Sequence, residues 1–582
     1  MNTSNVPSQK IAAAAIAGYE NITVWSDLLD RINVFPVADG DTGMNLRVSL
    51  APLRDCGISL EFAVAQLAAS GRGNSGNIAV AFFREFLSLA ETGLAGQARQ
   101  GRARAWEAIA NPCSGTMLAV FDALCSLLDE ESEDALSFIK IREHLQQAVF
   151  TTEKQLSELS EAGVVDSGAL GMFCFFDAFF QEYTGQKIDT SPVMELFGNS
   201  LCINASFQPP ATDEYCVEAR LVTKGQKDGI FSRIANLGNS VVVVPDDSGM
   251  KVHLHTRNPE QLRDKLSLLG DVVDWSNEAM DPMIGSADQK SFSNNQVRIM
   301  SDAAGSIPLE LARAYGIILL DSYILAGDQA TPESLFSSEQ LYVLMNGGTR
   351  VSTAQASNHE RHLHYQAAIQ QYEKVLYLCT GSAFTGNYLI ARAWQKNHDS
   401  DEQFTVLDTG AASGRLAVIA FLTARFAEEG SSAEKLVTYA ENLSHQVEEY
   451  VFIHELKHLV AGGRISRTKG FFGDLLHMKP VISPGFDGVK KLGVVRNRDA
   501  QLDFASTKIK RHADNADDLF VLLQYTDNKK WLTEVVEPQI RMLVPTAEIL
   551  LVPLSLTSGV HMGPGTWSIA FTSEMEAAHV KS

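Results

Sequence analysis

The pattern of hydrophobic and polar positions changes three times along this 582-residue chain. Up to about residue 186, apolar residues recur at helical spacing in thick stripes such as Ile78 to Leu89 and Gly171 to Phe180, which predicts the buried helices of a bundle. From about residue 190 to 270, short apolar runs of strand type take over, and these cover Tyr215 to Val222, Ser240 to Val244 and Lys251 to His255. The first part is therefore expected to be helical, and the second to contain a sheet.

Strands and helices alternate from Gln296 onward, because Val297 to Ser301, Lys374 to Cys379 and Phe404 to Leu407 are each followed by a helical pattern. This alternation predicts an α/β domain or a pair of α/β lobes. Residues near 271 to 296 are polar and irregular, as expected of a linker. We therefore expect a multidomain protein, with an all-α domain over residues 1–186, a small α+β domain over 187–275, a linker over 276–295 and a two-lobed α/β domain over 296–582.

The most informative loop of the helical part is N-V-F-P-V-A-D-G-D-T-G-M-N, from Asn33 to Asn45. Asp39 and Asp41 lie two residues apart on this loop, which leads directly into a helical pattern. Such a loop suits Mg²⁺ and nucleotide phosphate, because hard cations prefer oxygen ligands and a helix N-terminus presents free N–H groups to anions. Asp and Gly also form ordinary solvated turns, so the loop alone leaves both interpretations open.

Three more loops of this kind follow in the same domain: S-G-R-G-N-S-G-N from Ser70, N-P-C-S-G-T-M-L from Asn111 and G-V-V-D-S-G-A-L from Gly163. Each places small residues and a capping side chain just ahead of a helical run, where backbone N–H groups and hydroxyls can contact phosphate, ribose or adenine. Small residues are also simply how many helices begin. Four such junctions, one with paired acids, favour a shared nucleotide site.

Residues 9 to about 186 resemble the ATP-binding L-subunit domain of the dihydroxyacetone kinases, in the version found in bacterial fatty acid kinases, because these four phrases recur there in the same order. The resemblance implies an all-helical barrel whose loops at one end hold ATP and Mg²⁺. It implies that Asp39 and Asp41 are catalytic metal ligands, with Asn33 as a third oxygen ligand. It also implies nucleotide contacts from the four loops: Thr42, Gly43, Asn45, Gly73, Asn74, Ser75, Gly76, Thr116, Met117, Asp166, Ser167 and Gly168.

Composition narrows the setting of the protein. A net charge of −22 argues against non-specific binding to nucleic acid or anionic membranes, which basic patches drive. No apolar stretch approaches about 18 uncharged residues, so we expect no integral membrane segment, and the polar residues 1–9 do not form a signal-peptide core. Seven cysteines without a C-x-x-C pair fit a reducing compartment, so a cytoplasmic location is expected.

The middle part carries one candidate metal site. His253 and His255 lie on the same face of a predicted strand, because side chains repeat every two residues, and Cys216 on an earlier strand would complete a soft zinc site. By spacing alone, two such histidines are more often surface or core residues. The phrases Y-C-x-E and V-H-x-H-T nevertheless resemble the central domain of fatty acid kinases, which implies that these three residues hold zinc.

The last part holds a second set of phrases rich in hydroxyls and glycines, among them S-T-A-Q-A-S from Ser352, T-G-S-A-F-T-G-N-Y from Thr380, G-G-R-I-S from Gly462 and H-M-G-P-G from His561. Such groups at strand ends suit the polar end of a ligand. The region resembles the DegV family of fatty-acid-binding proteins nearly end to end. The resemblance implies two lobes around one acyl chain, whose carboxylate contacts Thr353, Ser382 or Thr385, and His561. Arg464 completes this lipid-binding set as an anion partner or a docking residue. Ala354 and Asn387 stand where the family usually has hydroxyls.

Taken together, the sequence predicts a fused, fatty acid kinase-like enzyme that transfers the γ-phosphoryl group of Mg·ATP to a bound fatty acid, which gives an acyl phosphate and ADP. The expected partners are the fatty acid, ATP, a second copy of the chain in a homodimer and a downstream acyltransferase that uses the acyl phosphate; no nucleic acid is expected. Two alternatives stay open. One is a glycerone-type kinase of a small polyol, and the other is a non-catalytic, nucleotide-gated lipid carrier or sensor.

Overall fold

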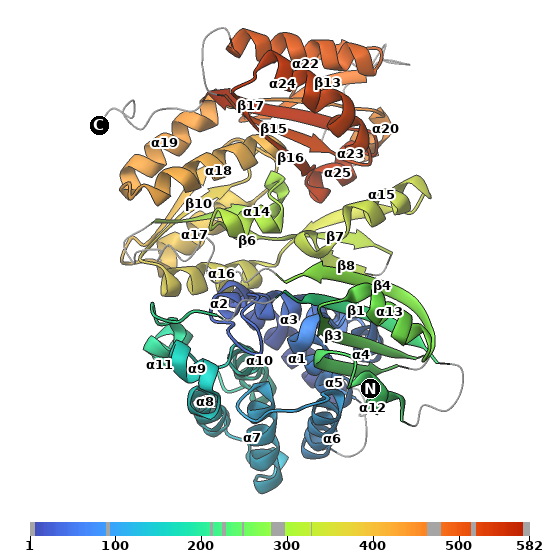
Figure 1. Cartoon of the computed structure of the whole chain (residues 1–582). Coiled ribbons are helices and arrows are strands. Elements are labelled where there is room, and N and C mark those ends of the chain that lie inside the picture. The colour runs from blue at the N-terminus through green and yellow to red at the C-terminus, as the bar shows by residue number, and fades with distance from the viewer. Residues whose placement is uncertain are drawn as a thin grey trace. The chain divides into compact units, whose positions relative to one another are not determined.

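The structure, a computed structural model, describes residues 6–88, 93–209, 213–223, 229–246, 249–280, 297–327, 329–461, 479–513 and 519–573. The chain divides into two compact units, residues 1–291 and 292–582 (Figure 1). Within the described ranges, no helix is both long enough and apolar enough to span a bilayer. All seven cysteines lie in these ranges, and none forms a disulfide.

The first unit begins with a helical domain, as the hydrophobic pattern predicts. Its α-helices are α1 (Val6–Val24), α2 (Ser26–Arg31), α3 (Thr42–Leu50), α4 (Leu60–Ser70), α5 (Gly73–Phe86), α6 (Gly93–Ala108), α7 (Met117–Glu130), α8 (Phe138–Gln155), α9 (Ser157–Ala162), α10 (Ser167–Thr184) and α11 (Val193–Phe197). Short 3₁₀ helices cover Ala51–Gly57, Glu133–Ala135 and Gly198–Leu201.

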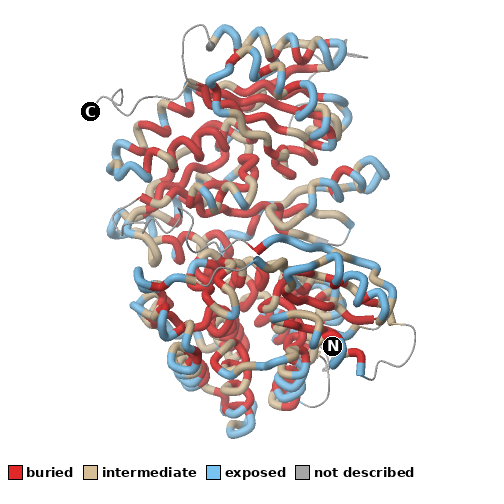
Figure 2. The backbone as a smooth tube through the Cα atoms, viewed as in Figure 1, coloured by how far each residue is buried: buried red, intermediate tan, exposed pale blue. Residues whose placement is uncertain are grey.

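Helix α10 is the central helix of this domain. Its residues are apolar nearly all round, and it packs against α1, α7 and α8. Most of the helix is therefore buried, the class drawn in red in Figure 2. Phe176 of α10 is fully buried among aromatic rings, including those of Phe82 and Phe121, which stack on each other with centroids 3.9 Å apart. This cluster forms the core that holds the loops in place.

The helical domain extends beyond the expected boundary at residue 186. The ring of Phe197 in α11 lies 5.0 Å from that of Phe150 and 5.2 Å from that of Phe173, so α11 packs on α8 and α10. The backbone N–H of Val165 also donates to the carbonyl of Ser200, at 3.1 Å. The chain therefore leaves this domain only after α11, and the expected boundary is too early.

The middle domain is an antiparallel sheet with two short helices on one face. Its elements are β1 (Tyr215–Val222), α12 (Ile230–Ile234), β2 (Asn239–Pro245), β3 (Met250–Thr256), α13 (Pro259–Ser267) and β4 (Asp271–Ala279), and the strand order is β2-β3-β1-β4. Alternate strand residues such as Val217 and Val252 form a core with α12 and α13, to which α13 contributes Leu262. The opposite face meets the helical domain, where the N–H of Ala110 donates to the carbonyl of Val241 at 3.0 Å.

The segment expected as a linker begins later than predicted. Residues 271–279, which the sequence presents as irregular, form strand β4, because this segment pairs with β1 along its length. Its side chains are mostly exposed, so it lacks the apolar alternation by which a strand is recognised. The expected domain end at residue 275 is thus too early, and residues 281–295 lie outside the described residues.

The second unit contains three sheets. A parallel sheet has the order β11-β10-β5-β6, a mixed sheet has the order β14-β13-β12-β17-β15-β16, and a small antiparallel sheet has the order β8-β7-β9. The strands are β5 (Val297–Asp302), β6 (Ile318–Leu320), β7 (Ser322–Ala326), β8 (Gln329–Pro332), β9 (Val351–Gln355), β10 (Lys374–Cys379), β11 (Phe404–Asp408), β12 (Glu448–Phe452), β13 (Lys479–Gly485), β14 (Gly488–Val495), β15 (Leu519–Tyr525), β16 (Glu548–Pro553) and β17 (Trp567–Ser573).

Helix α18 (Ser413–Glu428) joins the parallel and mixed sheets of this unit. It is buried nearly all round, and its side chains share one core with residues of β5, β10, β15 and β17. The remaining helices are α14 (Leu309–Ala314), α15 (Ser338–Asn346), α16 (Asn358–Gln371), α17 (Asn387–His398), α19 (Ala433–Gln446), α20 (Leu456–Ala461), α22 (Arg498–Ala513), α23 (Lys529–Trp531), α24 (Glu537–Leu543) and α25 (Leu556–Met562), with a π-helix over Leu532–Val536.

Replacing the central aromatic residue, Phe176→Ala, should destabilise the first unit by about 3–5 kcal/mol, because it leaves a large cavity among rings that cannot close it. Denaturant unfolding followed by circular dichroism measures this loss. Phe62→Ala serves as the control, since that ring is 44% exposed, and it should change stability by less than about 1 kcal/mol. Equal losses in the two variants would contradict the assignment of α10 as the core.

Candidate functional site

Four helix N-termini of the helical domain meet at one cavity. The cavity has a volume of about 220 Å³, and residues at the starts of α3, α5, α7 and α10 line it, including Thr42, Ser75, Met117 and Ser167. A helix start carries a partial positive charge. Four of them around one cavity make a site suited to a polyanion, as the four loops predict.

The acid pair lies at this cavity. Asp39 and Asp41 both line it, and Asp41 directly precedes α3. The N-terminal N–H groups of α3 are satisfied by Asp30, whose Oδ1 accepts from Gly43 at 2.6 Å and from Met44 at 3.1 Å. Burial raises the pKa of Asp39 well above its usual range, and the charge of Asp41 raises it further. Two carboxylates that disfavour each other's charge are a donor set that a divalent cation would stabilise.

Asn33 orients the acid pair in this structure. Its amide Nδ2 donates to Asp39 Oδ1 at 2.6 Å, while its Oδ1 accepts from Thr42 Oγ1 at 3.0 Å and from Ser167 Oγ at 3.3 Å. The oxygen that was expected to be a third metal ligand is thus used twice within the protein, and the nitrogen faces Asp39. The hydrogen bonds let Asn33 orient Asp39, and its role as a third metal ligand stays a prediction.

The expected nucleotide contacts separate into two groups. One group lines the cavity: Thr42, Asn74, Ser75, Thr116, Met117, Asp166, Ser167 and Gly168. The other group, which includes Gly43, Asn45, Gly73 and Gly76, packs behind it. A Cβ at Gly76 would lie 2.0 Å from Ser49 Oγ, and Gly73 has a φ of +58° with its Cβ position 2.0 Å from Asn45 Nδ2. The glycines therefore let α5 start directly against α3.

Asp166 is the buried cap of α10. Its Oδ1 accepts from the N–H of Ala169 at 2.7 Å, and its own N–H donates to Thr152 Oγ1 at 2.9 Å. Burial raises the pKa of Asp166 to about 7, and backbone N–H groups of Ala169, Gly168 and Met117 oppose that rise. This carboxyl group therefore changes its charge near neutral pH, within the wall of the cavity.

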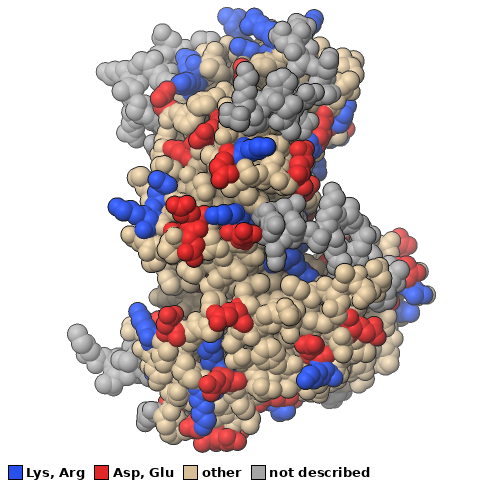
Figure 3. Space-filling model, turned by 90° about the vertical axis from the view of Figure 1, so that its left-hand side faces the viewer, with Lys and Arg blue, Asp and Glu red and all other residues tan. Residues whose placement is uncertain are grey.

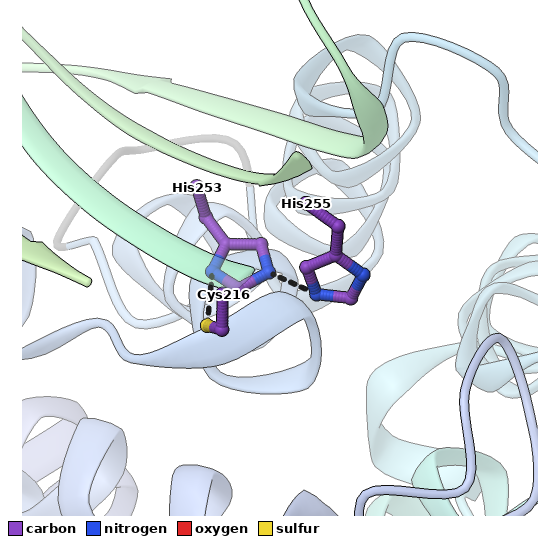
Figure 4. Close-up of side chains that lie close together, drawn as sticks. All are labelled: Cys216, His253 and His255. Atoms are coloured by element: carbon purple, nitrogen blue, oxygen red, sulfur yellow. Dashed lines mark hydrogen bonds between the residues drawn. The ribbon is translucent and has the colours of Figure 1, made fainter. Parts of the chain in front are cut away.

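The three expected zinc ligands come together on the middle sheet (Figure 4). Their donor atoms lie within 4.8 Å of one another, and the Nε2 atoms of His253 and His255 are 3.2 Å apart. Tetrahedral zinc with Zn–N bonds of about 2.0–2.1 Å separates two nitrogens by roughly 3.3 Å, so the pair has a suitable spacing. Cys216 Sγ lies 3.8 Å from His253 Nδ1. Cysteine and histidine together are the donor set that zinc prefers.

Strand register places this cluster. In the antiparallel pairing of β1 with β3, Cys216 lies opposite His255 and Glu218 lies opposite His253. Burial would lower the pKa of both histidines; at His253 the hydrogen bonds to Cys216 and Glu218 outweigh burial and raise the pKa to about 10. Burial and the neighbouring His253 lower the pKa of His255 to about 3.

The middle sheet completes the wall of the cavity. Ser240, Val241, Val242, His253 and His255 line it together with Asp39 and Asp41, so the two histidines of the cluster and the acid pair face the same space. The sequence predicts the two groups separately, in different domains, and nothing in it predicts that they share one cavity. Glu218, which also belongs to this face, was not predicted as a site residue, although the phrase Y-C-x-E contains it and its position two residues after Cys216 places it on the same side of β1.

In the second unit the structure brings together two of the expected lipid-binding residues. Thr353 of β9 and His561 near the end of α25 are hydrogen-bonded, with Oγ1 and Nε2 3.2 Å apart. The pair links the small antiparallel sheet to α25, whose Leu556 and Val560 pack with Ile324 and Tyr342. A hydroxyl and an imidazole at this spacing are suitable donors for one carboxylate.

The other three expected residues differ. Ser382 and Thr385 lie on the loop between β10 and α17, where Thr385 Oγ1 accepts from the N–H of Asn387, and Arg464 lies outside the described residues. A buried carboxylate that the sequence did not predict as functional fixes this loop. Asp302 accepts from Thr380 N–H at 2.8 Å, from Asn387 Nδ2 at 3.1 Å and from Tyr377 OH at 2.8 Å.

Charged side chains are spread over the face of the protein that Figure 3 draws. On the face drawn in Figure 3, acidic and basic side chains of the described residues are interspersed. The net charge of −22 is therefore not gathered into one acidic area on that face.

Three family models match successive parts of the chain. Residues 36–181 match the DAK2 domain, residues 212–284 match a middle domain of the fatty acid kinase type, and residues 296–574 match the DegV family. The chain thus combines these three kinds of domain in one polypeptide, and they follow the order that the sequence phrases suggest.

Curated relatives cover only part of the chain. It is similar to an uncharacterized protein of Staphylococcus haemolyticus, with 28% identity over 290 residues, which are 44% of this chain and 52% of the relative. It is also similar to an uncharacterized protein of Staphylococcus aureus, with 26% identity over 308 residues, which are 48% of this chain and 56% of the relative. The chain therefore spans about half the length of the curated relatives it matches.

Among solved structures, the chain is similar to DegV, a fatty acid binding protein from Bacillus subtilis, with a TM-score of 0.44 and 19% identity over 48% of this chain and 99% of that one. It is also similar to a DegV family protein from Thermus thermophilus whose fatty acid binding is described, with a TM-score of 0.44 and 21% identity over 48% and 99% of the two chains.

The raised pKa of Asp166 predicts a specific pH dependence. A folded-state pKa of about 7, against a usual 3.8, means that the protonated carboxyl favours folding below about pH 4 and that this contribution is lost as the pH rises through 7. Asp166→Asn, which mimics the neutral form, should therefore match wild type near pH 4 and exceed it above pH 7, by up to about 4 kcal/mol. Thermal unfolding from pH 4 to 8 measures this, and parallel curves for the two proteins would contradict it.

Proposed function

We propose that this chain, which joins a DAK2 domain, a fatty acid kinase-type middle domain and a DegV domain, is an ATP-dependent kinase that phosphorylates the carboxylate of a fatty acid. The products are an acyl phosphate and ADP. The observation that carries the proposal is the single cavity lined by the acid pair, four helix N-termini and the two histidines of the cysteine–histidine cluster. Phosphate groups and cations need this combination, whereas a purely structural junction does not.

The reaction suits the residues of the cavity. A fatty acid carboxylate is already ionised near pH 7, so no general base is needed. One carboxylate oxygen forms a bond to the γ-phosphorus while the bond to the ADP oxygen breaks, and no proton is exchanged. The residues must therefore align two anions and offset their charge. The helix starts that carry Ser75, Met117 and Ser167 would direct the partial positive charge of three helix ends toward the nucleotide phosphates.

Mg²⁺ would be held by Asp39 and Asp41. Two neighbouring residues, Asn33 and Asp30, stabilise the positions of these acids. Bound Mg²⁺ would supply charge neutralisation for the phosphates. Asn33 holds Asp39 through its amide, and Asp30 caps α3 so that Asp41 does not have to. Zinc would be held by Cys216, His253 and His255, the donor set described above.

The lipid carboxylate would be bound in the second unit by Thr353 and His561. Their hydrogen bond marks a position where a carboxylate can accept from both groups. Covalent joining of the lipid-binding and nucleotide-binding domains replaces a bimolecular encounter by a tethered one, with an effective concentration on the order of millimolar.

Hydroxylamine trapping tests the proposed activity directly. Purified protein is incubated with Mg·ATP and a panel of fatty acids, and an acyl phosphate is captured as its hydroxamate. Hydroxamate and ADP in equal amounts would support the proposal. ADP release with dihydroxyacetone in place of a fatty acid would favour the polyol kinase, and lipid binding without any turnover would favour the carrier or sensor.

Asp41→Asn should lower turnover by at least about a hundredfold, because it removes a charged group that offsets phosphate charge in a buried site through its bound cation. The Kd for a fatty acid should stay within about twofold of wild type, since that site lies in the other unit. Hydroxamate yield and fluorescent lipid titration measure the two effects. Asp189→Asn, an exposed acid of the same unit, is the matched control and should behave as wild type.

His561→Ala should show the opposite pattern. Loss of a hydrogen bond to an ionised carboxylate costs about 1.5–3 kcal/mol, which weakens fatty acid binding about ten- to a hundredfold. Mg·ADP affinity should not change. His398→Ala, at an exposed histidine of the same unit, controls for loss of an imidazole. If His561→Ala weakened nucleotide binding and left lipid binding intact, the assignment of the two sites would be wrong.

A further inference from the structure

One carboxylate connects the metal-type cluster of the middle sheet to a helix of the nucleotide-type cavity. Glu218 Oε1, on β1, lies 3.0 Å from His253 Nδ1 and accepts from the backbone N–H of Gly73 at 2.8 Å. It also lies 3.3 Å from Asn77 Nδ2. Gly73 is the first residue of α5, so a single oxygen contacts a candidate metal ligand and the start of a helix in a different domain.

Lys251 holds the other end of the same loop. Its Nζ donates to the carbonyl of Gly71, and it lies 3.6 Å from Glu218 Oε2. The two side chains are both largely buried, with exposures of 13% and 11%. The ion pair from the middle sheet therefore binds the backbone of Gly71 and Gly73. The next two residues, Asn74 and Ser75, line the cavity.

The geometry leaves little room for these groups to move independently. A Cβ at Gly71 would lie 2.4 Å from Asn77 Oδ1, and one at Gly73 would lie 2.0 Å from Asn45 Nδ2, so the loop is packed on both sides. His253 is 1% exposed. A rotation of its ring would take Nδ1 away from Glu218 and leave a buried carboxylate short of a partner, which is costly.

We propose that Glu218 is a positioning residue that couples zinc occupancy of the Cys216–His253–His255 cluster to nucleotide binding at the start of α5. This inference rests on the proposed function, since it assumes that the cavity binds a nucleotide. When His253 Nε2 serves as a zinc ligand, its ring is fixed and Nδ1 stays on Glu218. Glu218 then holds the N–H of Gly73 in a fixed position, and this also fixes the positions of the next two residues, Asn74 and Ser75. By linkage, a bound nucleotide strengthens zinc binding by the same factor.

The coupling is tested by binding measurements on the full chain, without any assay of turnover. Calorimetric titration gives the Kd of Mg·ADP for the zinc-free and the zinc-loaded protein, and competition with a chromophoric chelator gives the zinc Kd with and without Mg·ADP. In wild type, zinc should tighten Mg·ADP binding at least about fivefold, with a matching effect of Mg·ADP on zinc.

Glu218→Gln keeps the shape of the side chain but removes its charge and weakens the hold on His253. In this variant the zinc Kd should rise about 10- to 100-fold. The effect of saturating zinc on the Mg·ADP Kd should fall below about twofold, under the lower limit of ordinary coupling. Glu278→Gln is the matched control, because Glu278 is exposed on β4 opposite Cys216, and it should keep the full wild-type coupling.

Lys251→Met provides an independent test if Glu218→Gln does not fold, as judged by its thermal unfolding. It releases the Gly71 carbonyl from the sheet. Mg·ADP binding should weaken at least about fivefold in the zinc-loaded protein. Wild-type affinity in this variant would overturn the role of the ion pair.

The outcomes distinguish this inference from the proposed function. If wild-type protein binds no Mg·ADP at all, the proposed nucleotide site fails. If it binds Mg·ADP with the same Kd in the presence and absence of zinc, or if Glu218→Gln keeps the wild-type coupling, the proposed kinase stands and the coupling role of Glu218 is overturned.

Discussion

The candidate site depends above all on the antiparallel register between β1 and β3. That register sets Cys216 opposite His255 and Glu218 opposite His253, on the face of the sheet that meets the helical domain. Side chains alternate along a strand, so a shift of the register by one residue would turn the polar side chains of one strand toward the core formed with α12 and α13. The apolar residues on the other face, such as Val217 and Val252, prevent that shift because they must stay buried. Hydrophobic burial on one face thereby fixes polar chemistry on the other.

The helical domain serves the site in a different way. Its apolar central helix, α10, lies in an aromatic core that does not depend on the loops for its stability. The loops can therefore carry charged groups whose burial is unfavourable by itself. Asp39 and Asp41 place two negative charges near each other, and Asp166 is buried with a raised pKa. Neutral partners such as Asn33, and the backbone N–H groups of helix starts, hold these acids in place. A rigid core therefore supports a locally unfavourable set of charges.

The second unit shows the same division between scaffold and site. Asp302 at the end of β5 was not expected to be functional, yet it organises the loop before α17 through Thr380 and Asn387. Asn387 is one of its partners. Thr385 Oγ1 accepts from the N–H of Asn387 at the start of α17, which leaves the hydroxyl proton able to donate. The Thr353–His561 pair is the part of the expected lipid site that the fold assembles from distant segments.

The sequence alone determined the helical, sheet and α/β parts of this protein, because apolar periodicity over many residues records which faces must be buried. It also determined the phosphate-type loops, since turn and cap chemistry is local, and it predicted Cys216, His253 and His255 as one cluster. It misplaced β4, whose exposed residues carry no apolar alternation, and it did not predict that Asn33 contacts Asp39, Thr42 and Ser167. Only the tertiary structure decided that the acid pair shares one cavity with His253 and His255, and that Glu218 links His253 to the start of α5. Contacts between residues 145 positions apart in the chain, such as Glu218 with Gly73, depend on how two domains pack, and no local pattern encodes that packing.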